Sequence, residues 1–543
     1  MNPLLLTDGY KTSHNKQYPE GTTLVYSNFT PRSNRYAPKG CNEVVVFGTQ
    51  MVMMQIHETF QKDFFDKPKD EVCGEMKREL SMYLGIDYDV SHFEALWDLQ
   101  YLPIIVKSLP EGTKAPIKVP VMTIYNTHPD FYWITNYLET ILSNLLWKPM
   151  TSATIAHQYR KVLTEWMEKT DKTNHQFIDW QGHDFSMRGM DSVEAVISSG
   201  LGHLTSFLGT DSLPTIYGAR KYYGAEGFVA ASVPATEHSV MCAGGKEDEV
   251  ATFRRLLNTY PTGILSVVSD TWDLWKVCTE HIITLKEEIL ARDGKLVIRP
   301  DSGDPVDILC GAYNTISSGD EQNLDHNYPK YGVEKDSPEY KGVIELLWDV
   351  FGGTVNEQGY KVLDPHIGAI YGDSITIDRA NEICARLEAK GFASTNVVLG
   401  IGSFTYQYNT RDTFGFAMKA TYVEVKHWDV ATERLNESFG KNANPEWVEG
   451  REIFKDPITD DGTKKSATGL LSVHNHDGKY VLIDRCTWEG ESVSSFQPIY
   501  KNGKFFNVTT LSEIREKLAH SNNKKLVTKV LEMANLIHKS KNK

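Results

Sequence analysis

The chain has 543 residues, of which 57 are lysine or arginine and 71 are aspartate or glutamate, giving a formal net charge of −14 at pH 7. This acidic balance argues against a general nucleic-acid coat and against a protein of anionic membranes, because both present basic surfaces. Hydrophobic residues make up 41% and charged residues 24%, which is ordinary for a globular protein. At ~150 residues per domain the length predicts several domains, although one barrel can take up ~250 residues.

The sequence favours a cytoplasmic protein. The apolar run Leu4–Leu6 near the N-terminus is too short for a signal peptide. No window of the sequence approaches the ~18 to 20 apolar residues of a membrane span. The seven cysteines are scattered, odd in number and never spaced as CxxC. That pattern is typical of a reduced protein and not of a disulfide framework or a zinc site.

The first 125 residues combine short β-type runs with loops. Strands are predicted over Thr23–Phe29, Glu43–Phe47 and Pro103–Lys107. Phe131–Trp147 then has apolar residues at helical spacing, and Pro149 is expected to end that helix. A second, amphipathic helix is predicted over Thr151–Lys169.

A unit then recurs in which a short apolar run ends abruptly in polar, acidic or glycine residues. The runs are Gln176–Trp180, Gly227–Val233, Ile264–Val268, Lys295–Ile298, Ile367–Tyr371 and Asn396–Leu399. Helices are predicted between most of them, over Val193–Ser206, Glu247–Asn258, Trp272–Leu290, Lys341–Val350 and Asp378–Lys390. This alternation is typical of βαβ units around a parallel sheet. Polar residues directly after the strands indicate a (β/α) barrel with its site at the carboxyl ends.

Beyond Lys419 the pattern returns to β-type runs. Residues 427–450 are polar and irregular and have the character of an insertion, and the runs Leu470–Val473 and Tyr480–Asp484 are expected to pair around a turn at Asp477-Gly478. Helices are predicted over Leu511–Ala519 and Lys524–His538. The predicted fold class is therefore α/β. A barrel-like domain of residues 151–419 accompanies a β-rich α+β domain built from residues 1–150 and 420–543.

Common cofactor motifs are missing from the sequence. There is no GxxxxGK[ST] and no HExxH, and Gly400-Ile401-Gly402 lacks a third glycine at dinucleotide spacing. The usual phosphoribosyltransferase signature of two acids before a Thr-Gly loop is not visible either. Any anion site must be built in another way.

Arg299 and Asp301 follow a predicted strand directly, and Ser302-Gly303 comes next. Arginine suits phosphate through its paired donors, and a carboxylate beside it suits sugar hydroxyls or Mg²⁺. An Arg–Asp pair that only closes a loop is the alternative. The strand context and the glycine favour a functional site.

His238 also follows a β-type run, between Glu237 and Ser239. A histidine there can act as a base, a metal ligand or a phosphate acceptor, although a lone histidine is more often structural. No second histidine or cysteine stands at metal spacing, which argues against zinc.

Other polar groups admit two interpretations. His183–Gly189 contains Phe185 and Arg188, which suit a flat ring and a phosphate, or else form an ordinary loop. The cluster Asp8, Tyr10, Lys11 and His14 is either a solvated arm or part of a site. The cations downstream of the predicted barrel either bind a polyphosphate or form an ordinary solvent-exposed surface. They are Arg411, Lys419, Lys455, Lys464 and Lys465.

Taken together, these segments resemble the nicotinamide phosphoribosyltransferase family over nearly the whole chain. The resemblance lies in their shared order, and no segment decides it alone. The segments are Thr7–Pro19, Tyr132–Asn136, His183–Phe185, Gly209–Asp211, Ser232–Ser239, Ser266–Asp270, Ile298–Gly303, Gly372-Asp373, Thr410–Asp412 and Phe454–Pro457.

The resemblance implies that nicotinamide and phosphoribosyl pyrophosphate give nicotinamide mononucleotide and pyrophosphate, in NAD salvage. It also implies Mg²⁺ carried by the pyrophosphate, ATP hydrolysis through a phosphohistidine, and a homodimer with active sites at the subunit interface. Nucleic-acid and membrane partners are not expected. The nearest alternative is a nicotinate or quinolinate phosphoribosyltransferase. A sugar-phosphate lyase or aldolase is disfavoured because the strand ends named above offer no Schiff-base lysine, and a non-enzymatic binding protein is disfavoured by His238, Arg299 and Asp301.

The resemblance also assigns residues. It implies that Phe185 and a Tyr10 from the partner chain enclose the nicotinamide ring and that Asp211 accepts from its carboxamide. His238 takes the phosphoryl group, with Asp270 and Glu237 near it, and Asp301 and Asp373 face the ribose. Product phosphate or ribose is expected at Arg188, Arg299, Gly372 and Gly402, and the substrate site also includes Asp8, Ser232, Ser266 and Ser403. Pyrophosphate or ATP phosphates are expected at Arg32, Arg411, Lys419, Lys455 and Lys464.

Three departures from the family pattern stand out. Gly400-Ile401-Gly402-Ser403 replaces a glycine triplet, Asp191 stands where a small hydroxyl residue is expected, and residues 427–450 are additional. They bear on kinetics and ATP coupling more than on reaction class.

Overall fold

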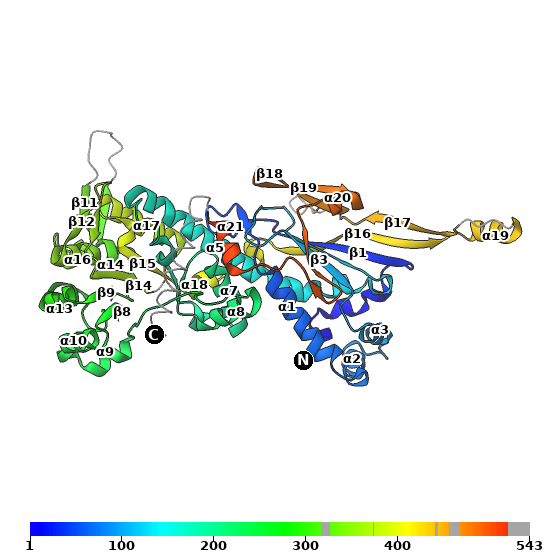
Figure 1. Cartoon of the computed structure of the whole chain (residues 1–543), viewed down its shortest axis with the longest axis horizontal. Coiled ribbons are helices and arrows are strands. Elements are labelled where there is room, and N and C mark those ends of the chain that lie inside the picture. The colour runs from blue at the N-terminus through cyan, green and yellow to red at the C-terminus, as the bar shows by residue number, and fades with distance from the viewer. Residues whose placement is uncertain (317–325, 373, 440–443, 456–457, 459–466, 520–543) are drawn as a thin grey trace. The chain divides into compact units, whose positions relative to one another are not determined.

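The computed structural model describes residues 1–316, 326–372, 374–439, 444–455, 458 and 467–519 (Figure 1). The chain divides into two compact units. The first is built from residues 1–154 and 220–224 together with the described residues from 409 onward, and the second from residues 155–219 and 225–408. The predicted fold class, a barrel-like α/β unit and a β-rich unit drawn from both ends of the chain, is confirmed.

The first unit contains an antiparallel seven-stranded sheet within its described residues. The strand order is β17 (Glu446–Glu452), β16 (Ala417–Trp428), β1 (Thr22–Thr30), β5 (Met122–Asn126), β3 (Ile104–Ser108), β20 (Gln497–Lys501) and β21 (Lys504–Phe505). The inner strand β1 is mostly buried, and the ring of its Phe29 stacks on Phe416 with centroids 5.1 Å apart. The sheet thus joins segments from opposite ends of the sequence, which explains why both ends share one unit.

The additional residues 427–450 are more regular than the sequence predicts. β16 and β17 run side by side with α19 (Val430–Phe439) at the tip of the hairpin (Figure 1). Cross-strand contacts order this polar segment, including the stacked rings of His427 and Trp447 at 4.4 Å. Pairing with β16 supplies the backbone hydrogen bonds that the sequence pattern alone does not reveal.

The predicted C-terminal hairpin is confirmed. β18 (Leu470–His476) pairs with β19 (Lys479–Cys486), and Asp477 and Gly478 both have positive φ, as a tight two-residue turn requires. A smaller pair joins β2 (Glu43–Val45) to β4 (Lys114–Pro116). The helix α21 (Leu511–Leu518) forms as predicted, whereas Lys524–His538 lies outside the described residues.

The expected helix end at Pro149 is wrong. α5 (Glu139–Thr170) runs through this proline and supplies residues to both units. Proline normally interrupts a helix because it lacks an N–H and crowds the preceding turn. Here Pro149 is buried and packs so closely on Gly48 that a Cβ at residue 48 would lie 2.6 Å from the proline ring. This tertiary packing offsets the lost hydrogen bond. The other helices of the first unit are α1 (Thr49–Phe60), α2 (Lys69–Leu84), α3 (Ser91–Leu99), α4 (Ile134–Tyr137) and α20 (Trp488–Ser492).

The second unit is built on a parallel six-stranded sheet. Its order is β7 (Gly209–Thr210), β6 (Gly182–Asp184), β15 (Val397–Ile401), β14 (Ile367–Tyr371), β9 (Asp293–Arg299) and β8 (Thr262–Val268). The four longest strands match the apolar runs of the sequence. The run Gln176–Trp180 does not form a strand. It leads instead into the short helix α6 (Ile178–Gln181), because a short apolar run cannot be told from a buried helix by its periodicity.

An extended segment joins the two edges of this sheet. Ala231 bridges to Gly209 of β7, and Ala235 bridges to Ser266 of β8. The backbone bonds are Thr210 N–H to Ala231 C=O at 3.1 Å and Ser266 N–H to Pro234 C=O at 2.9 Å. The predicted strand Gly227–Val233 is thus reduced to bridges, yet it closes the curled sheet and carries Ser232 to the barrel mouth.

Helices cover the sheet and bury one large apolar core. The longer ones are α7 (Val193–Leu204), α8 (Leu213–Tyr223), α10 (Glu249–Thr259), α16 (Val343–Phe351) and α17 (Ile377–Ala389). The predicted helix Trp272–Leu290 is interrupted and contains α11 (Leu274–Lys276), α12 (Ile282–Thr284) and α13 (Lys286–Leu290). Shorter helices are α9 (His238–Gly244), α14 (Pro305–Cys310), α15 (Pro338–Lys341) and α18 (Ser403–Tyr406).

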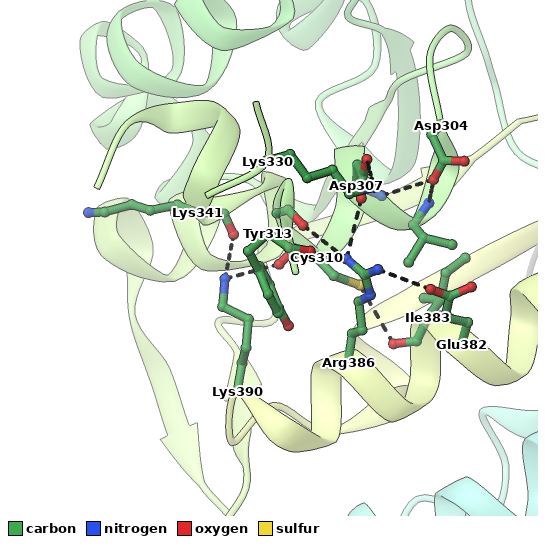
Figure 2. Close-up of polar contacts among 12 residues, drawn as sticks. Asp304, Asp307, Cys310, Tyr313, Lys330, Lys341, Glu382, Ile383, Arg386 and Lys390 are labelled. Atoms are coloured by element: carbon green, nitrogen blue, oxygen red, sulfur yellow. Dashed lines mark hydrogen bonds and ion pairs between the residues drawn. The ribbon is translucent and has the colours of Figure 1, made fainter. Parts of the chain in front are cut away.

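A polar network fastens α17 to α14 and to the strand pair β10 (Tyr313–Ile316) and β11 (His326–Pro329) (Figure 2). Arg386 of α17 donates to the Asp307 carboxylate at 3.3 Å and to the Tyr313 carbonyl at 3.3 Å. Lys330 donates to the same carboxylate at 2.6 Å, and Lys390 donates to the Cys310 carbonyl at 3.0 Å. The charged groups Arg386, Asp307, Lys330 and Lys390 are all paired, which indicates a structural role. The buried Tyr313 hydroxyl has no hydrogen-bond partner among the described residues.

The described helices include none with both the length and the apolar character needed to cross a membrane. None of the seven cysteines, all of which lie in the described part of the chain, forms a disulfide bond.

Candidate active site

The barrel of the second unit contains a cavity of about 460 Å³. Every second residue of β9 faces the cavity, namely Lys295, Val297 and Arg299. This follows from the two-residue period of a strand. Phe185, Asp211 and Ser232 line it at the carboxyl ends. The cavity therefore extends along the strands from the expected site end, at Arg299, to Lys295 at the opposite end.

Phe185 presents an aromatic face at the carboxyl end of β6. Its backbone N–H donates to the Ile401 carbonyl at 3.0 Å, which fixes the residue directly beyond the sheet. The ring of His183 lies beside it with centroids 4.5 Å apart. Phe185 is thus part of the cavity wall, which favours the ring-binding interpretation over a core residue.

Asp211 supplies a carboxylate to the same end of the cavity. Its Oδ1 accepts hydrogen bonds from His183 Nε2 at 2.9 Å and from the Ser232 hydroxyl. Burial alone would raise the pKa of Asp211, but these two donors and the nearby Arg299 charge bring it below its ordinary value. Asp211 is therefore an ionised acceptor at neutral pH.

Two donors at the cavity wall have no protein partner among the described residues. They are the Arg299 Nε and the Ser266 hydroxyl, both buried. Another Arg299 nitrogen donates to the Thr236 carbonyl at 2.7 Å, which holds the guanidinium in place. Because both residues line the cavity, these two donors suit a ligand that brings acceptor oxygens.

A second group of polar residues surrounds the ends of β9, β14 and β15. The Asp301 carboxylate lies so close to Gly372 that a Cβ there would stand 2.5 Å from Asp301 Oδ1. Gly189, next to the exposed Arg188, likewise leaves room for the Ser403 side chain. Gly402 precedes α18 directly. Gly372 and Gly189 thus leave room for the neighbouring side chains of Asp301 and Ser403.

His238 begins α9 and pairs with Asp270. The imidazole Nε2 lies 3.0 Å from Asp270 Oδ1, with the His238 side chain 47% exposed and that of Asp270 5% exposed. The Asp301 N–H donates to Asp270 Oδ2 at 3.0 Å, and so does the Ser302 hydroxyl, at 2.5 Å. Burial would raise the pKa of Asp270, but these donors lower it below its usual value. Glu237 accepts from Ser239 instead of contacting His238.

In the first unit, side-chain contacts to α5 fix the N-terminal segment, and the side chain of Tyr10 is exposed to solvent. The Asp8 carboxylate accepts from Thr140 at 2.7 Å, and Lys11 pairs with Glu139 at 2.7 Å. The Tyr10 side chain is 63% exposed and contacts His14 with ring centroids 5.5 Å apart. The segment is therefore an ordered arm with an exposed aromatic ring.

The predicted cations of this unit gather around Lys419. Burial lowers the pKa of Lys419, Glu139 raises it, and the charges of Arg32, Lys11 and Lys455 lower it further. Burial and the charge of Arg411 likewise lower the pKa of Arg32. Such a concentration of positive charge in an acidic protein suits a polyphosphate.

The structure brings together two groups of the predicted residues in the barrel unit and one in the β-rich unit. The cavity group is Phe185, Asp211, Ser232, Ser266 and Arg299. The second barrel group is His238, Asp270 and Asp301, which are joined through Asp270. Asp373 and Lys464 lie outside the described residues. Asp191, the unusual acid, is exposed, and its N–H lies 3.4 Å from Gln407.

The side chains of three residues contribute to the site although the sequence pattern assigned them no role: His183, Ser302 and Lys295. The two-residue strand period, which aligns Lys295 with Arg299, was a usable signal for one of them. The other two depend on contacts between different strands. Among the described residues, no group of three or more histidine, cysteine, aspartate or glutamate side chains is arranged to hold a metal.

The chain is similar in sequence to known protein families and to individual proteins. A model of the nicotinate phosphoribosyltransferase (NAPRTase) family matches residues 180–436, and a model of the nicotinamide phosphoribosyltransferase N-terminal domain matches residues 2–94. A nicotinamide phosphoribosyltransferase of Acinetobacter baylyi is 47% identical over 531 residues, covering 96% of this chain and 97% of the relative. One of Xanthomonas campestris pv. campestris is 32% identical over 524 residues, covering 95% and 97%.

The fold also has a solved counterpart. The crystal structure of human nicotinic acid phosphoribosyltransferase aligns with a TM-score of 0.50 at 16% sequence identity, covering 94% of this chain and 92% of that one. At this identity the likeness concerns the fold alone. The sequence matches extend over almost the full length of both bacterial relatives, and on their strength the chain belongs to the nicotinamide phosphoribosyltransferase family of pentosyltransferases.

Proposed function

We propose that the protein transfers the phosphoribosyl group of phosphoribosyl pyrophosphate to the ring nitrogen of nicotinamide, giving nicotinamide mononucleotide and pyrophosphate for NAD salvage. One observation carries this proposal. A single cavity combines the aromatic face of Phe185, the ionised acceptor Asp211 and the unpaired donor Arg299 Nε. A carboxamide on an aromatic ring has a flat face, an N–H donor and a carbonyl acceptor, so it satisfies all three groups.

The residues suit the charges of this reaction. As the bond between ribose and pyrophosphate breaks, positive charge develops on the sugar and negative charge on the leaving group. Asp301 lies at the strand ends, where a carboxylate would stabilise the sugar. The pyridine nitrogen is a neutral, weak nucleophile, so holding it in line by the ring and the carboxamide supplies much of the rate enhancement.

Mg²⁺ is proposed to arrive with the pyrophosphate substrate. Mg²⁺ keeps several of its waters and usually binds in proteins mainly through substrate phosphates. When bound, it would neutralise charge on the leaving pyrophosphate. The cations around Lys419 are proposed to bind pyrophosphate or ATP phosphates.

We further propose that ATP hydrolysis is coupled through phosphorylation of His238. The half-exposed imidazole has one nitrogen held by the buried Asp270, which leaves the other available as a nucleophile. The carboxylate orients the ring and stabilises the positive charge that it carries once phosphorylated. A cytoplasmic homodimer, in which the exposed Tyr10 completes the ring site of the partner subunit, is part of the same proposal.

The direct test is product detection. Purified protein is mixed with phosphoribosyl pyrophosphate, Mg²⁺ and, separately, nicotinamide, nicotinate or quinolinate, with and without ATP. Nicotinamide mononucleotide should form fastest, and ATP should raise its yield. Preferential formation of nicotinate mononucleotide would assign the chain to the alternative activity, and no product from any of the three would overturn the proposal.

A further inference from the structure

His183 occupies a position between the two groups that face the ring. It belongs to β6, and its side chain is largely buried. One side of its ring lies beside Phe185, and its Nε2 reaches Asp211 Oδ1 at 2.9 Å. A carboxylate can only accept hydrogen bonds, so Nε2 must carry the proton. The contact therefore fixes both the tautomer and the direction of the donor.

The surroundings hold the imidazole in this orientation. A Cβ at Gly209 would lie 2.6 Å from His183 Nδ1, so only glycine leaves room for the ring. The Asp211 N–H donates to the Asp184 carbonyl at 3.0 Å, which anchors the backbone of the carboxylate to β6. Parallel pairing of His183 with Gly209 sets the register between the two strands. Donor and acceptor are thus positioned by backbone contacts and not by each other alone.

The two oxygens of Asp211 have different partners. Oδ1 accepts from both His183 and Ser232, whereas Oδ2 receives no hydrogen bond from any described residue. Charged or titratable neighbours that act on the carboxylate are His183 of β6 and Arg299 of β9. Oδ2 is therefore the atom left for a substrate N–H, and the occupied Oδ1 prevents the carboxylate from rotating away.

We propose that His183 is a positioning residue that sets the choice between amide and acid substrates, by donating to Asp211 Oδ1 and leaving Oδ2 to face the substrate. This inference rests on the proposed function. An ionised Oδ2 accepts from a carboxamide NH₂ and repels a carboxylate. Without the His183 donor, Asp211 takes up a proton more readily and, once protonated, can donate to the carboxylate of nicotinate.

Two substitutions distinguish the effect of the His183 hydrogen-bond donor from the effect of its aromatic ring. His183→Phe keeps an aromatic ring beside Phe185 and removes the donor. His183→Gln removes the ring and keeps an N–H at nearly the distance of Nε2. The ratio of kcat/KM for nicotinamide to that for nicotinate is measured from pH 6 to 8.5 in each variant. Thermal unfolding of both variants is recorded, and nicotinamide binding is measured by calorimetry.

His183→Phe should lower the ratio roughly 10- to 100-fold, with nicotinate use rising as the pH falls. His183→Gln should stay within about threefold of wild type, since it keeps the donor. Adding Asp211→Asn to His183→Phe should lower the ratio no further, because both changes remove one interaction. An unchanged ratio in a folded, nicotinamide-binding His183→Phe, or an equal loss in both single variants, would overturn the inference. Wild-type protein that makes no nicotinamide mononucleotide would instead refute the proposed function.

Discussion

The imidazole of His238 and the carboxylate of Asp270 form a pair with one exposed and one buried member, with Nε2 and Oδ1 separated by 3.0 Å. Such a pair presents a nucleophile to a ligand while its orienting group stays away from water. The same carboxylate accepts from the Asp301 N–H, so the pair is connected to the strand end that carries the proposed ribose site.

Replacing His238 by Ala should abolish ATP hydrolysis, because the proposed phosphate acceptor is gone, and should lower nicotinamide mononucleotide synthesis without removing it. Inorganic phosphate release and mononucleotide formation are measured on the same samples. Glu237→Gln, next in sequence but hydrogen-bonded to Ser239, is the matched control. ATP turnover at the wild-type rate in His238→Ala would rule out the phosphohistidine.

Asp211→Asn should weaken the preference for nicotinamide over nicotinate by roughly 10- to 100-fold, since the charge that repels a carboxylate is lost. The readout is the ratio of the two kcat/KM values. Asp191→Asn, which neutralises an exposed acid of the same unit, should leave the ratio near wild type. A ratio unaffected by Asp211→Asn contradicts the assigned role.

The proposed dimer predicts complementation between inactive variants. Tyr10→Ala and Phe185→Ala should each lose most activity. Mixing the two after reversible dissociation should restore about a quarter of wild-type activity, because half of the random dimers are mixed and each has one intact site. Activity that stays at the level of the separate variants would mean that both residues act in the same chain.

Gly372→Ala should lower kcat/KM by roughly 10- to 100-fold, because the added Cβ would stand 2.5 Å from Asp301 Oδ1 and displace that carboxylate. Gly74→Ala is the control, because a Cβ at this helical glycine of α2 meets no atom within 4 Å. Steady-state kinetics give kcat/KM for both variants and test this expectation. Equal activities would show that Asp301 tolerates the displacement.

Lys295→Met should raise the melting temperature by a few degrees at pH 7. Burial lowers the pKa of Lys295, only partly opposed by Asp364, so the folded state binds this proton more weakly than the unfolded chain. The charged amine therefore destabilises the fold below its unfolded pKa of about 10.4, and this cost disappears as the pH rises past that value. The gain from Lys295→Met should accordingly shrink between pH 7 and pH 10.5.

Thermal unfolding monitored by circular dichroism across that pH range tests whether the gain in melting temperature from Lys295→Met shrinks as the pH rises. The exposed Lys161 of the same unit gives a control, as Lys161→Met should leave the melting temperature nearly unchanged. A gain that grows with pH would contradict the assignment of a buried, poorly compensated charge.

The sequence by itself determined the elements whose signals are local. β14 coincides with the run Ile367–Tyr371 because an apolar segment bounded by polar residues must be buried on both faces of a parallel sheet. The turn at Asp477-Gly478 follows from the positive φ that these residues tolerate. The order of polar strand ends also placed His238 and Arg299 in one unit before any contact was known, whereas Asp211 was assigned only through the family resemblance.

Only the tertiary structure decided the features that depend on long-range contacts. Pro149 lies inside a helix because Gly48, 101 positions earlier in the sequence numbering, leaves space for its ring. His183 reaches Asp211 because β6 and β7 are parallel neighbours, and Ser232 joins them because residues 231–235 bridge both sheet edges. A sequence pattern reports which side of its own strand or helix a residue occupies. It does not report which distant strand lies beside it, and the chemistry of this cavity is set by those neighbours.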